Sequence, residues 1–367
     1  MRQEAHASVS TALRRLIATA ISRNGDWLPF DRFMALALYA PGLGYYAQGS
    51  PKFGLFPASG SDFVTAPELS ARFGRALARQ VHQALDACRS DEVWEFGAGS
   101  GALAEQLLDE LGERVRRYTI VDVSGALRAR QRERLARHAA RLVWAEALPD
   151  SLAGVVVGNE VLDAMPVQLL HRDTERWLER GVVVQGDAFA FADRPTALRP
   201  PADVAAALGA GSTTEIHAQA HAFIATLGER LSRGAAFFID YGFPEAEYYH
   251  PQRSGGTLMC HRAHRADSDP LSDVGAKDIT AHVDFTGVAL AAQEAGMTVI
   301  GYTSQARFLM NCGILEGLVD AGPAETARVQ KLLNEHEMGE LFKAIGLAKG
   351  CDFDPIGFAS GDRRHRL

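Results

Sequence analysis

The feature that most constrains the fold is a glycine-rich turn, Gly97-Ala98-Gly99-Ser100-Gly101, which directly follows the apolar run 93–96. Because glycine has no Cβ atom, alternate glycines let the backbone turn tightly and let a ligand approach it closely. Leucines spaced three and four residues apart after the turn predict a helix, whose first N–H groups are free to bind a ligand. The segment therefore predicts a strand, a ligand-binding turn and a helix.

Short apolar runs alternate with helical patterns through the middle of the chain, which is typical of βαβ units and of a doubly wound, mostly parallel α/β sheet. In such a sheet the loops after the strands lie along one edge, where ligands bind. Ser124 is the expected N-cap of a helix over 124–140. We expect parallel strands at 93–96, 118–123, 142–145, 155–157 and 235–239, and antiparallel strands at 168–171, 176–179, 182–185 and 188–192. Further on, we expect helices at 325–333 and 339–345 and a last strand at 353–358.

Composition argues against several classes of protein. The formal net charge is −7, whereas nucleic-acid-binding proteins are more often basic, so no nucleic-acid partner is expected. Four cysteines without a CxxC motif resemble neither a disulfide scaffold nor a zinc ribbon, and they fit a reducing compartment. No apolar run approaches the length of about 18 residues that a membrane span needs, so none is expected.

The N-terminal segment is expected to form an ordinary helix with Leu13, Leu16, Ile17 and Ile21 on one face. An amphipathic transit peptide is the alternative, because acidic residues are scarce there. We therefore expect a cytoplasmic location in a bacterium, or the mitochondrial matrix in a eukaryote.

Two acidic residues near the turn narrow the choice of ligand. Asp122 ends the second expected strand, where a carboxylate can accept hydrogen bonds from both ribose hydroxyls of an adenosine group. The spacing of Gly97, Gly99 and Ala102 also matches a dinucleotide fingerprint, so a NAD-dependent dehydrogenase stays open. Glu95, inside the strand before the turn, favours S-adenosyl-L-methionine, whose ammonium and sulfonium groups are cations. The alternative role for Glu95 is to support the loop through hydrogen bonds.

A second acidic segment, Gly158-Asn159-Glu160-Val161-Leu162-Asp163, follows the fourth expected strand and should lie at the same edge of the sheet. Asn159 can hydrogen-bond a substrate or the cofactor, and Glu160 and Asp163 share a face if the turn is helical. Paired carboxylates suit a guanidinium, because two parallel hydrogen bonds fix its plane. The alternative is a helix start that Asn159 caps, with Asp163 in solvent.

Histidine clusters and a basic helix are given less weight. His217 and His221 are four residues apart but lack a third ligand, and Cys260, His261 and His264 lie in a long polar loop, so no metal site is predicted. His282 is a candidate catalytic base that takes the proton released on methylation. The alternative for that segment is a helix start capped by Asp284. The arginines between residues 128 and 141 are read as a solvated helix face.

Several separated motifs, in one order along the chain, resemble the MidA-type methyltransferases, a family that includes the mitochondrial assembly factor of respiratory complex I. The matching segments are Gly44-Tyr45-Tyr46, residues 60–68, Phe73-Gly74, the glycine loop, Asn159-Glu160, residues 163–166, Asp240-Tyr241-Gly242, residues 278–285 and residues 338–342. Two departures are a longer, more polar stretch at 258–275, which bears on the substrate match, and Asp122 in place of a common Glu.

The resemblance implies a class I methyltransferase with a Rossmann-like sheet, S-adenosyl-L-methionine as cofactor, and methylation of a protein arginine, with a complex I subunit as candidate target. It also implies that residues 62–65 fold over the cofactor, so that Asp62 and Thr65 join the other predicted cofactor-binding residues, Glu95, Gly97, Gly99, Gly101, Asp122 and Asn159. The catalytic candidates, which come from the residues themselves, are Asn159, Glu160, Asp163 and His282. The alternative for residues 65–68 is a capping box.

The expected organisation is one methyltransferase domain with additions. Residues 1–90 are expected to form a helical and loop extension that covers cofactor and substrate. Residues 91–367 form the methyltransferase domain, with insertions at about 167–214 and 243–283 and a helical segment at about 313–350. Two alternatives to protein-arginine methylation remain: a methyltransferase for another nitrogen or a small molecule, and an assembly factor that binds the cofactor without turnover. The oligomeric state is open, and a homodimer is compatible with the sequence.

Overall fold

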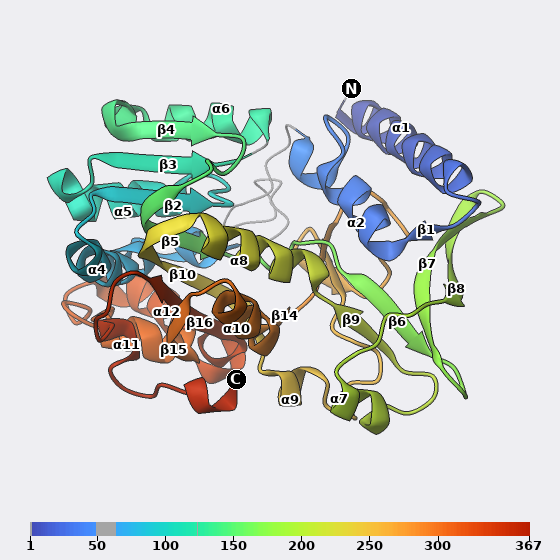
Figure 1. Cartoon of the computed structure of the whole chain (residues 1–367). Coiled ribbons are helices and arrows are strands. Elements are labelled where there is room, and N and C mark those ends of the chain that lie inside the picture. The colour runs from blue at the N-terminus through green and yellow to red at the C-terminus, as the bar shows by residue number, and fades with distance from the viewer. Residues whose placement is uncertain (1, 49–63, 123) are drawn as a thin grey trace.

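A computed structural model describes residues 2–48, 64–122 and 124–367. Its centre is a sheet of seven strands in the order β15-β16-β10-β5-β2-β3-β4, with the short β14 paired beside β10 (Figure 1). Neighbouring strands are parallel except where β16 pairs antiparallel with β10 and β15. The strand bounds are β2 Glu92–Phe96, β3 Arg117–Val121, β4 Leu142–Ala145, β5 Leu152–Asn159, β10 Leu231–Phe243, β14 Val283–Asp284, β15 Thr298–Ser304 and β16 Phe342–Lys349. The predicted mostly parallel, doubly wound sheet is confirmed.

Helices cover both faces of this sheet, because successive strand residues point to opposite sides. Val155 and Val157 pack in one apolar cluster with α4, α5, α11 and α12, whereas Val156 packs in another with α8 and α10. Ser124 caps α6 as predicted, since its hydroxyl oxygen accepts a hydrogen bond from the N–H of Leu127. The helix bounds are α4 Ala71–Cys88, α5 Ala102–Leu111, α6 Gly125–Arg134, α8 Ala218–Arg230, α10 Phe285–Glu294, α11 Gln305–Asn311 and α12 Gly322–Leu333.

A second, antiparallel sheet lies beside the N-terminal helices (Figure 1). Its order is β1-β7-β6-β9, with β8 paired to β7. Helices α1 and α2 share an apolar cluster with this sheet and with a small third sheet, β12-β11-β13. The bounds are α1 Arg2–Arg23, β1 Leu28–Pro29, α2 Phe30–Tyr39, α3 Ala66–Leu69, β6 Gln168–Arg172, β7 Trp177–Gln185, β8 Ala188–Pro195, α7 Ala202–Ala207, β9 Thr213–Ile216, α9 Glu245–Tyr248, β11 Met259–Arg262, β12 Arg265–Asp267 and β13 Asp278–Thr280.

Three local predictions are wrong. The expected strands 176–179 and 182–185 form one strand, β7, because Arg180 and Gly181 between them pair with Asp193 and Ala192 of β8 without a break. The expected helix 339–345 is largely strand β16, which is buried between β10 and β15, so tertiary pairing overrides its helical pattern. The helical segment at 313–350 therefore ends in a strand. Residues 353–358 form a loop and a short 3-10 turn instead of a last strand.

Within the described residues, none of the helices combines the length and apolar character that crossing a membrane requires.

Candidate active site

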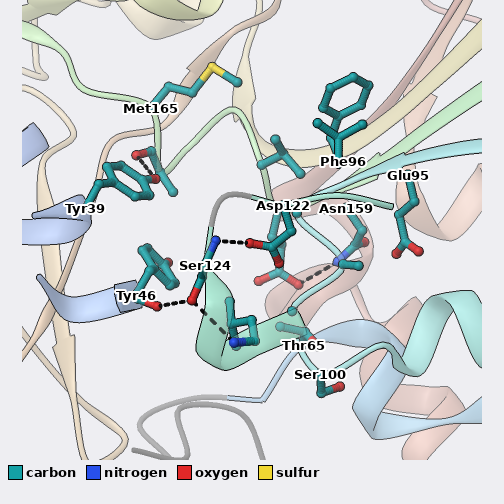
Figure 2. A pocket seen from close by; sticks show the side chains of 18 of the residues that line it. Tyr39, Tyr46, Thr65, Glu95, Phe96, Ser100, Asp122, Ser124, Asn159 and Met165 are labelled. Carbon is teal, nitrogen blue, oxygen red and sulfur yellow. Dashed lines mark hydrogen bonds between the residues drawn. The ribbon is translucent and has the colours of Figure 1, made fainter. Parts of the chain in front are cut away.

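A cavity of about 710 Å³ opens at the carboxyl edge of the main sheet, beside β2. Strand β2 pairs with β3 on one side and with β5 on the other, so the chain order reverses here, which is where open α/β sheets bind ligands. The loops after these three strands line the cavity, and Tyr39, Tyr46 and Thr65 of the N-terminal region complete its wall (Figure 2).

The glycine loop brings its backbone to this cavity. Gly97, Gly99 and Gly101 all have positive φ, at 63°, 53° and 83°, a conformation that glycine adopts without strain. A Cβ on Gly97 would lie 2.7 Å from a methyl carbon of Val161, so this position excludes larger residues. Gly97 and Gly99 line the cavity, whereas Gly101 is the N-cap of α5.

Glu95 and Asp122 both line the cavity, and neighbouring side chains hold each of them. Glu95 is buried and accepts a 2.7 Å hydrogen bond from the Tyr118 hydroxyl; burial raises its pKa to about 8. Asp122 accepts hydrogen bonds of 2.8 Å from the Ser124 N–H and from the Gln131 amide, and burial raises its pKa as well. Each carboxylate oxygen keeps a further lone pair for a ligand.

The turn at residues 159–163 presents the second acidic group to the cavity. Glu160 has a φ of 54°, which is uncommon for a residue with a side chain, and its N–H donates to the Ile239 carbonyl at 2.9 Å. Asn159 donates a 3.0 Å hydrogen bond to Glu160 (Figure 2). Burial and the nearby Asp163 raise the pKa of Glu160 to about 8, and burial raises that of Asp163 to about 6.

Two oxygen atoms of this turn are buried without a hydrogen-bond partner among the described residues. They are Oδ1 of Asn159 and Oδ1 of Asp163. Buried polar atoms are normally paired, because leaving one unpaired costs about 1–3 kcal/mol. The two atoms therefore mark a place where a donor from a ligand fits.

Asp240, from the motif Asp240-Tyr241-Gly242, supports the backbone of this turn. Its Oδ2 accepts the N–H groups of Val161, Leu162 and Asp163 at 3.0, 2.8 and 3.3 Å, and Oδ1 accepts that of Tyr241 at 2.9 Å. Asp240 is buried, and this burial raises its pKa. The sequence showed the motif but not this support.

Thr65 lines the cavity, and the capping box that was the alternative for residues 65–68 does not form. The Thr65 side chain makes no cap hydrogen bond to α3. Glu68 instead accepts hydrogen bonds from the Ser100 hydroxyl and from Arg134, the latter at 2.8 Å. The reading of Arg134 as part of a solvated face is therefore wrong, since it joins α6 to the glycine loop and to α3. Asp62 lies outside the described residues.

His282 does not line the cavity. Its ring stacks on Phe243 with a centroid distance of 5.2 Å, its Nδ1 lies 3.3 Å from the Thr257 carbonyl, and burial lowers its pKa to about 4. Asp284 accepts a hydrogen bond from the Gly287 N–H and caps α10, which is the alternative arrangement that the sequence allowed. The described residues contain no group of three side chains placed to hold a metal ion.

The sequence did not point to several residues that shape the site. The rings of Tyr39 and Tyr46 stack at 5.6 Å beside the cavity, and Tyr39 donates to the Ala164 carbonyl at 2.7 Å (Figure 2). Tyr46 donates to Asp278 at 2.8 Å. Tyr46 belongs to a recognisable motif, but neither tyrosine is near the glycine loop in sequence. Gln131 was not identified from the sequence, because it lies in a helix whose arginines were interpreted as a solvated face.

These features together define the class of protein. A doubly wound sheet with one antiparallel strand near its edge, a glycine loop after β2 and an acidic residue after β3 form the Rossmann-like fold of a class I methyltransferase.

Comparison with known proteins assigns the chain to a family. The family described as "Putative S-adenosyl-L-methionine-dependent methyltransferase" matches residues 76–303, and the chain belongs to it. A crystal structure from Burkholderia thailandensis, bound to S-adenosyl-homocysteine, is 51% identical with a TM-score of 0.95, and the match covers 99% of this chain and 98% of that chain. A native structure from the same organism is 49% identical with a TM-score of 0.88.

Curated relatives are more distant. "Protein arginine methyltransferase NDUFAF7, mitochondrial" of Danio rerio is 25% identical, over 92% of this chain and 87% of the relative. Its Homo sapiens counterpart is 26% identical, over 86% of this chain and 78% of the relative. The resemblance to MidA-type methyltransferases is thus confirmed, and the chain is an S-adenosyl-L-methionine-dependent methyltransferase. The site fits this cofactor, since its backbone-lined loop and buried carboxylates suit a ligand with cationic groups.

Proposed function

We propose that this methyltransferase modifies an arginine side chain of a protein substrate. The observation that carries the proposal is the acidic turn 159–163, whose Asn159, Glu160 and Asp163 line the same cavity as the glycine loop and include two buried oxygens without a partner among the described residues. A guanidinium is a planar cation with five N–H donors, so it can satisfy two carboxylates and an amide oxygen together. The distant curated relatives, which are named protein arginine methyltransferases, support it.

We assign the cofactor-binding residues to two groups. The backbone of Gly97, Gly99 and Gly101 shapes the loop on which the cofactor lies, and Asp122 accepts its ribose hydroxyls. Glu95, Thr65, Asn159 and Asp62 serve the cationic methionyl end. When bound, the cofactor supplies an electrophilic methyl group on sulfur.

We assign the acceptor to the turn. Glu160 and Asp163 accept hydrogen bonds from the guanidinium, and Asn159 accepts a further one through its free oxygen. This fixes the plane of the guanidinium and directs one nitrogen into the cavity, so that alignment contributes to the rate. The proton that this nitrogen loses passes to a carboxylate of the turn, because the first candidate base, His282, lies outside the cavity.

Labelled methyl transfer tests the proposal. Protein extract from cells that lack this chain is incubated with the purified enzyme and S-adenosyl-L-methionine carrying a labelled methyl group. We expect a labelled protein band whose digest contains methylarginine. Label on lysine, on another residue or on a small molecule would contradict the arginine assignment. No transfer to any acceptor would favour the assembly factor that binds the cofactor without turnover.

The variant Glu160→Gln separates transfer from cofactor binding. Removing the carboxylate lowers transfer by at least about a hundredfold, because the acceptor loses a charge-assisted contact in the reacting geometry. Affinity for S-adenosyl-homocysteine, measured by calorimetry, stays within about threefold. Glu215→Gln is the matched control: Glu215 is a buried glutamate that bonds Thr257, Leu258 and Tyr248 away from the cavity. Full transfer by Glu160→Gln would remove Glu160 from the mechanism.

The partner and the organisation of the chain complete the proposal. The MidA resemblance makes a subunit of respiratory complex I the first candidate for the labelled band, and the cytoplasm the expected location in a bacterium. Residues 1–90 are proposed to cover the cofactor and the acceptor, and the position of Tyr39, Tyr46 and Thr65 at the cavity supports this. Excision of the complex I subunit band and mass spectrometry of its arginines is the direct check.

A further inference from the structure

Gln131 has an unusual set of partners for a side chain that does not line the cavity. It lies on α6 and is fully buried. Its Nε2 donates to Oδ2 of Asp122 at 2.8 Å and to the Gly99 carbonyl at 3.1 Å, and its Oε1 accepts from the indole N–H of Trp144 on β4 at 3.0 Å. One amide thus joins the end of β3, the glycine loop and β4.

The chemistry of these partners leaves one orientation for the amide. The indole N–H can only donate, so the amide oxygen must face Trp144. The Gly99 carbonyl and the Asp122 carboxylate can only accept, so the amide nitrogen must face them. Glutamate at this position would lose both donors, methionine would lose all three hydrogen bonds, and asparagine is shorter by one methylene group. Glutamine is therefore matched to this place.

We propose that Gln131 is a positioning residue of the cofactor site, whose amide holds the Asp122 carboxylate and the glycine loop in one arrangement suited to the ribose. The inference rests on the proposed role of Asp122 as the ribose acceptor. The backbone N–H of Ser124 also holds the Asp122 carboxylate, through Oδ1. Without Gln131, Oδ2 loses the hydrogen bond that fixes its direction. Gly99 loses the same link to α6.

Affinity for two ligands that differ only in the two ribose hydroxyl groups tests this role. The ligands are S-adenosyl-homocysteine and its 2′,3′-dideoxy analogue, and calorimetry gives the dissociation constant of each. We expect Gln131→Glu and Gln131→Met to raise the dissociation constant of S-adenosyl-homocysteine by about tenfold to a hundredfold, which is the usual effect of losing a hydrogen bond to a charged group. For the 2′,3′-dideoxy analogue the same variants should raise the dissociation constant by less than about threefold, because both hydroxyl groups that Asp122 holds are absent.

Gln80→Met is the matched control. Gln80 is also fully buried on a helix, α4, and its amide bonds Gln83 and the N–H of Gly357, which do not line the cavity. It should bind both ligands as the unaltered protein does. If the Gln131 variants do not fold, Trp144→Phe removes the donor that orients the amide from a half-buried position, and we expect a loss of about threefold for S-adenosyl-homocysteine alone.

The pH dependence of binding adds a readout that a purely structural role would not move. Burial raises the pKa of Asp122, whereas the hydrogen bonds from the Ser124 N–H and from Gln131 and the charge of Arg128 lower it. The charge of Asp122 in turn raises the pKa values of Glu95 and Tyr39. Loss of the amide should therefore raise the pH below which S-adenosyl-homocysteine affinity falls. Gln80→Met should leave this pH unchanged.

The possible results separate the two levels of the proposal. If the unaltered protein binds both ligands equally, Asp122 does not hold the ribose, and the inference fails with that assignment. If the unaltered protein discriminates between them but the Gln131 variants lose affinity for both ligands equally, or for neither, Asp122 keeps its role and the positioning by Gln131 is overturned. In neither case is arginine as acceptor affected.

Discussion

The cofactor edge contains the buried Glu95 and Asp122 beside the glycine loop, and the acceptor turn at 159–163 contains the buried Asn159 and Asp163. Both parts are acidic, yet they differ in how their polar atoms are held. Tyr118 bonds Glu95, while Gln131 and Ser124 bond Asp122. In the acceptor turn, oxygens of Asn159 and Asp163 have no partner among the described residues, and Glu160 holds a positive φ.

This difference indicates that the two parts are organised in different ways. The cofactor edge is held in place by the protein itself, so a cofactor meets a prepared surface and little has to move. Burial raises the pKa values of acids in both parts, so the difference lies in the unpaired oxygens of the acceptor turn, which a bound cation with N–H donors would satisfy. The Asp240 carboxylate accepts hydrogen bonds from three backbone N–H groups of the turn and so keeps the turn in place. Three variants test this contrast, and one of them is the Glu160→Gln variant introduced above.

Gly97→Ala should have the largest effect, because it disturbs both parts at once. The added Cβ would lie 2.7 Å from Val161 in the acceptor turn, and alanine at a φ of 63° is strained by about 1–2 kcal/mol. We expect affinity for S-adenosyl-homocysteine to fall by about a hundredfold, measured by calorimetry, and transfer to fall with it.

Gly255→Ala is the control for this substitution, since a Cβ there meets no atom within 4 Å. It should bind S-adenosyl-homocysteine as the unaltered protein does. Near-normal affinity of Gly97→Ala would show that the cofactor edge yields more easily than its hydrogen bonds suggest.

Glu160→Gln should change how stability depends on pH. Burial raises the pKa of Glu160 from its ordinary value of 4.5 to about 8, so the folded protein favours the protonated form. The stability that this group contributes is complete below pH 4.5 and is lost as the pH rises to about 8. The ligand-free variant should therefore melt a few degrees higher than the unaltered protein at pH 8.5 or so, and the difference should shrink toward pH 5.

Thermal melts across this pH range measure the effect. Glu113→Gln, at an exposed position, is the control and should follow the unaltered protein. A variant that melts lower at every pH would mean that Glu160 stabilises the ligand-free turn, and the contrast between the two parts would fail.

Arg134→Ala should have the smallest effect of the three. Arg134 joins Glu68 of α3 to Ser100 of the glycine loop and also bonds Glu105, all from a partly buried position. We expect affinity for S-adenosyl-homocysteine to fall about threefold to tenfold, because the loop loses one of its supports. Arg137→Ala removes a more exposed ion pair to Glu105 and Asp109 and should stay within about twofold. Equal losses in both variants would assign the effect to general surface charge.

Contiguous features were predictable from the sequence. The strand, turn and helix around Gly97 form because glycine spacing and leucine periodicity act locally, and Asp122 and Glu160 follow apolar runs that could only be parallel strands in this alternation. Local sequence patterns suggested a helix cap at three positions. The side chains of Ser124 and Asp284 cap their helices, whereas that of Thr65 does not. Glu68 bonds Ser100 and Arg134 instead, partners that a local pattern cannot reveal.

By itself, the sequence determined the parallel sheet, the glycine loop and which acids stand at the carboxyl ends of its strands, because these follow from residue spacing over a few turns. The tertiary structure alone decided that Gln131 orients Asp122, that Asp240 supports the acceptor turn, and that His282 packs against Phe243 away from the cavity. The physical reason is that a side chain's hydrogen bonds and burial depend on neighbours distant in the chain, which no short-range pattern encodes.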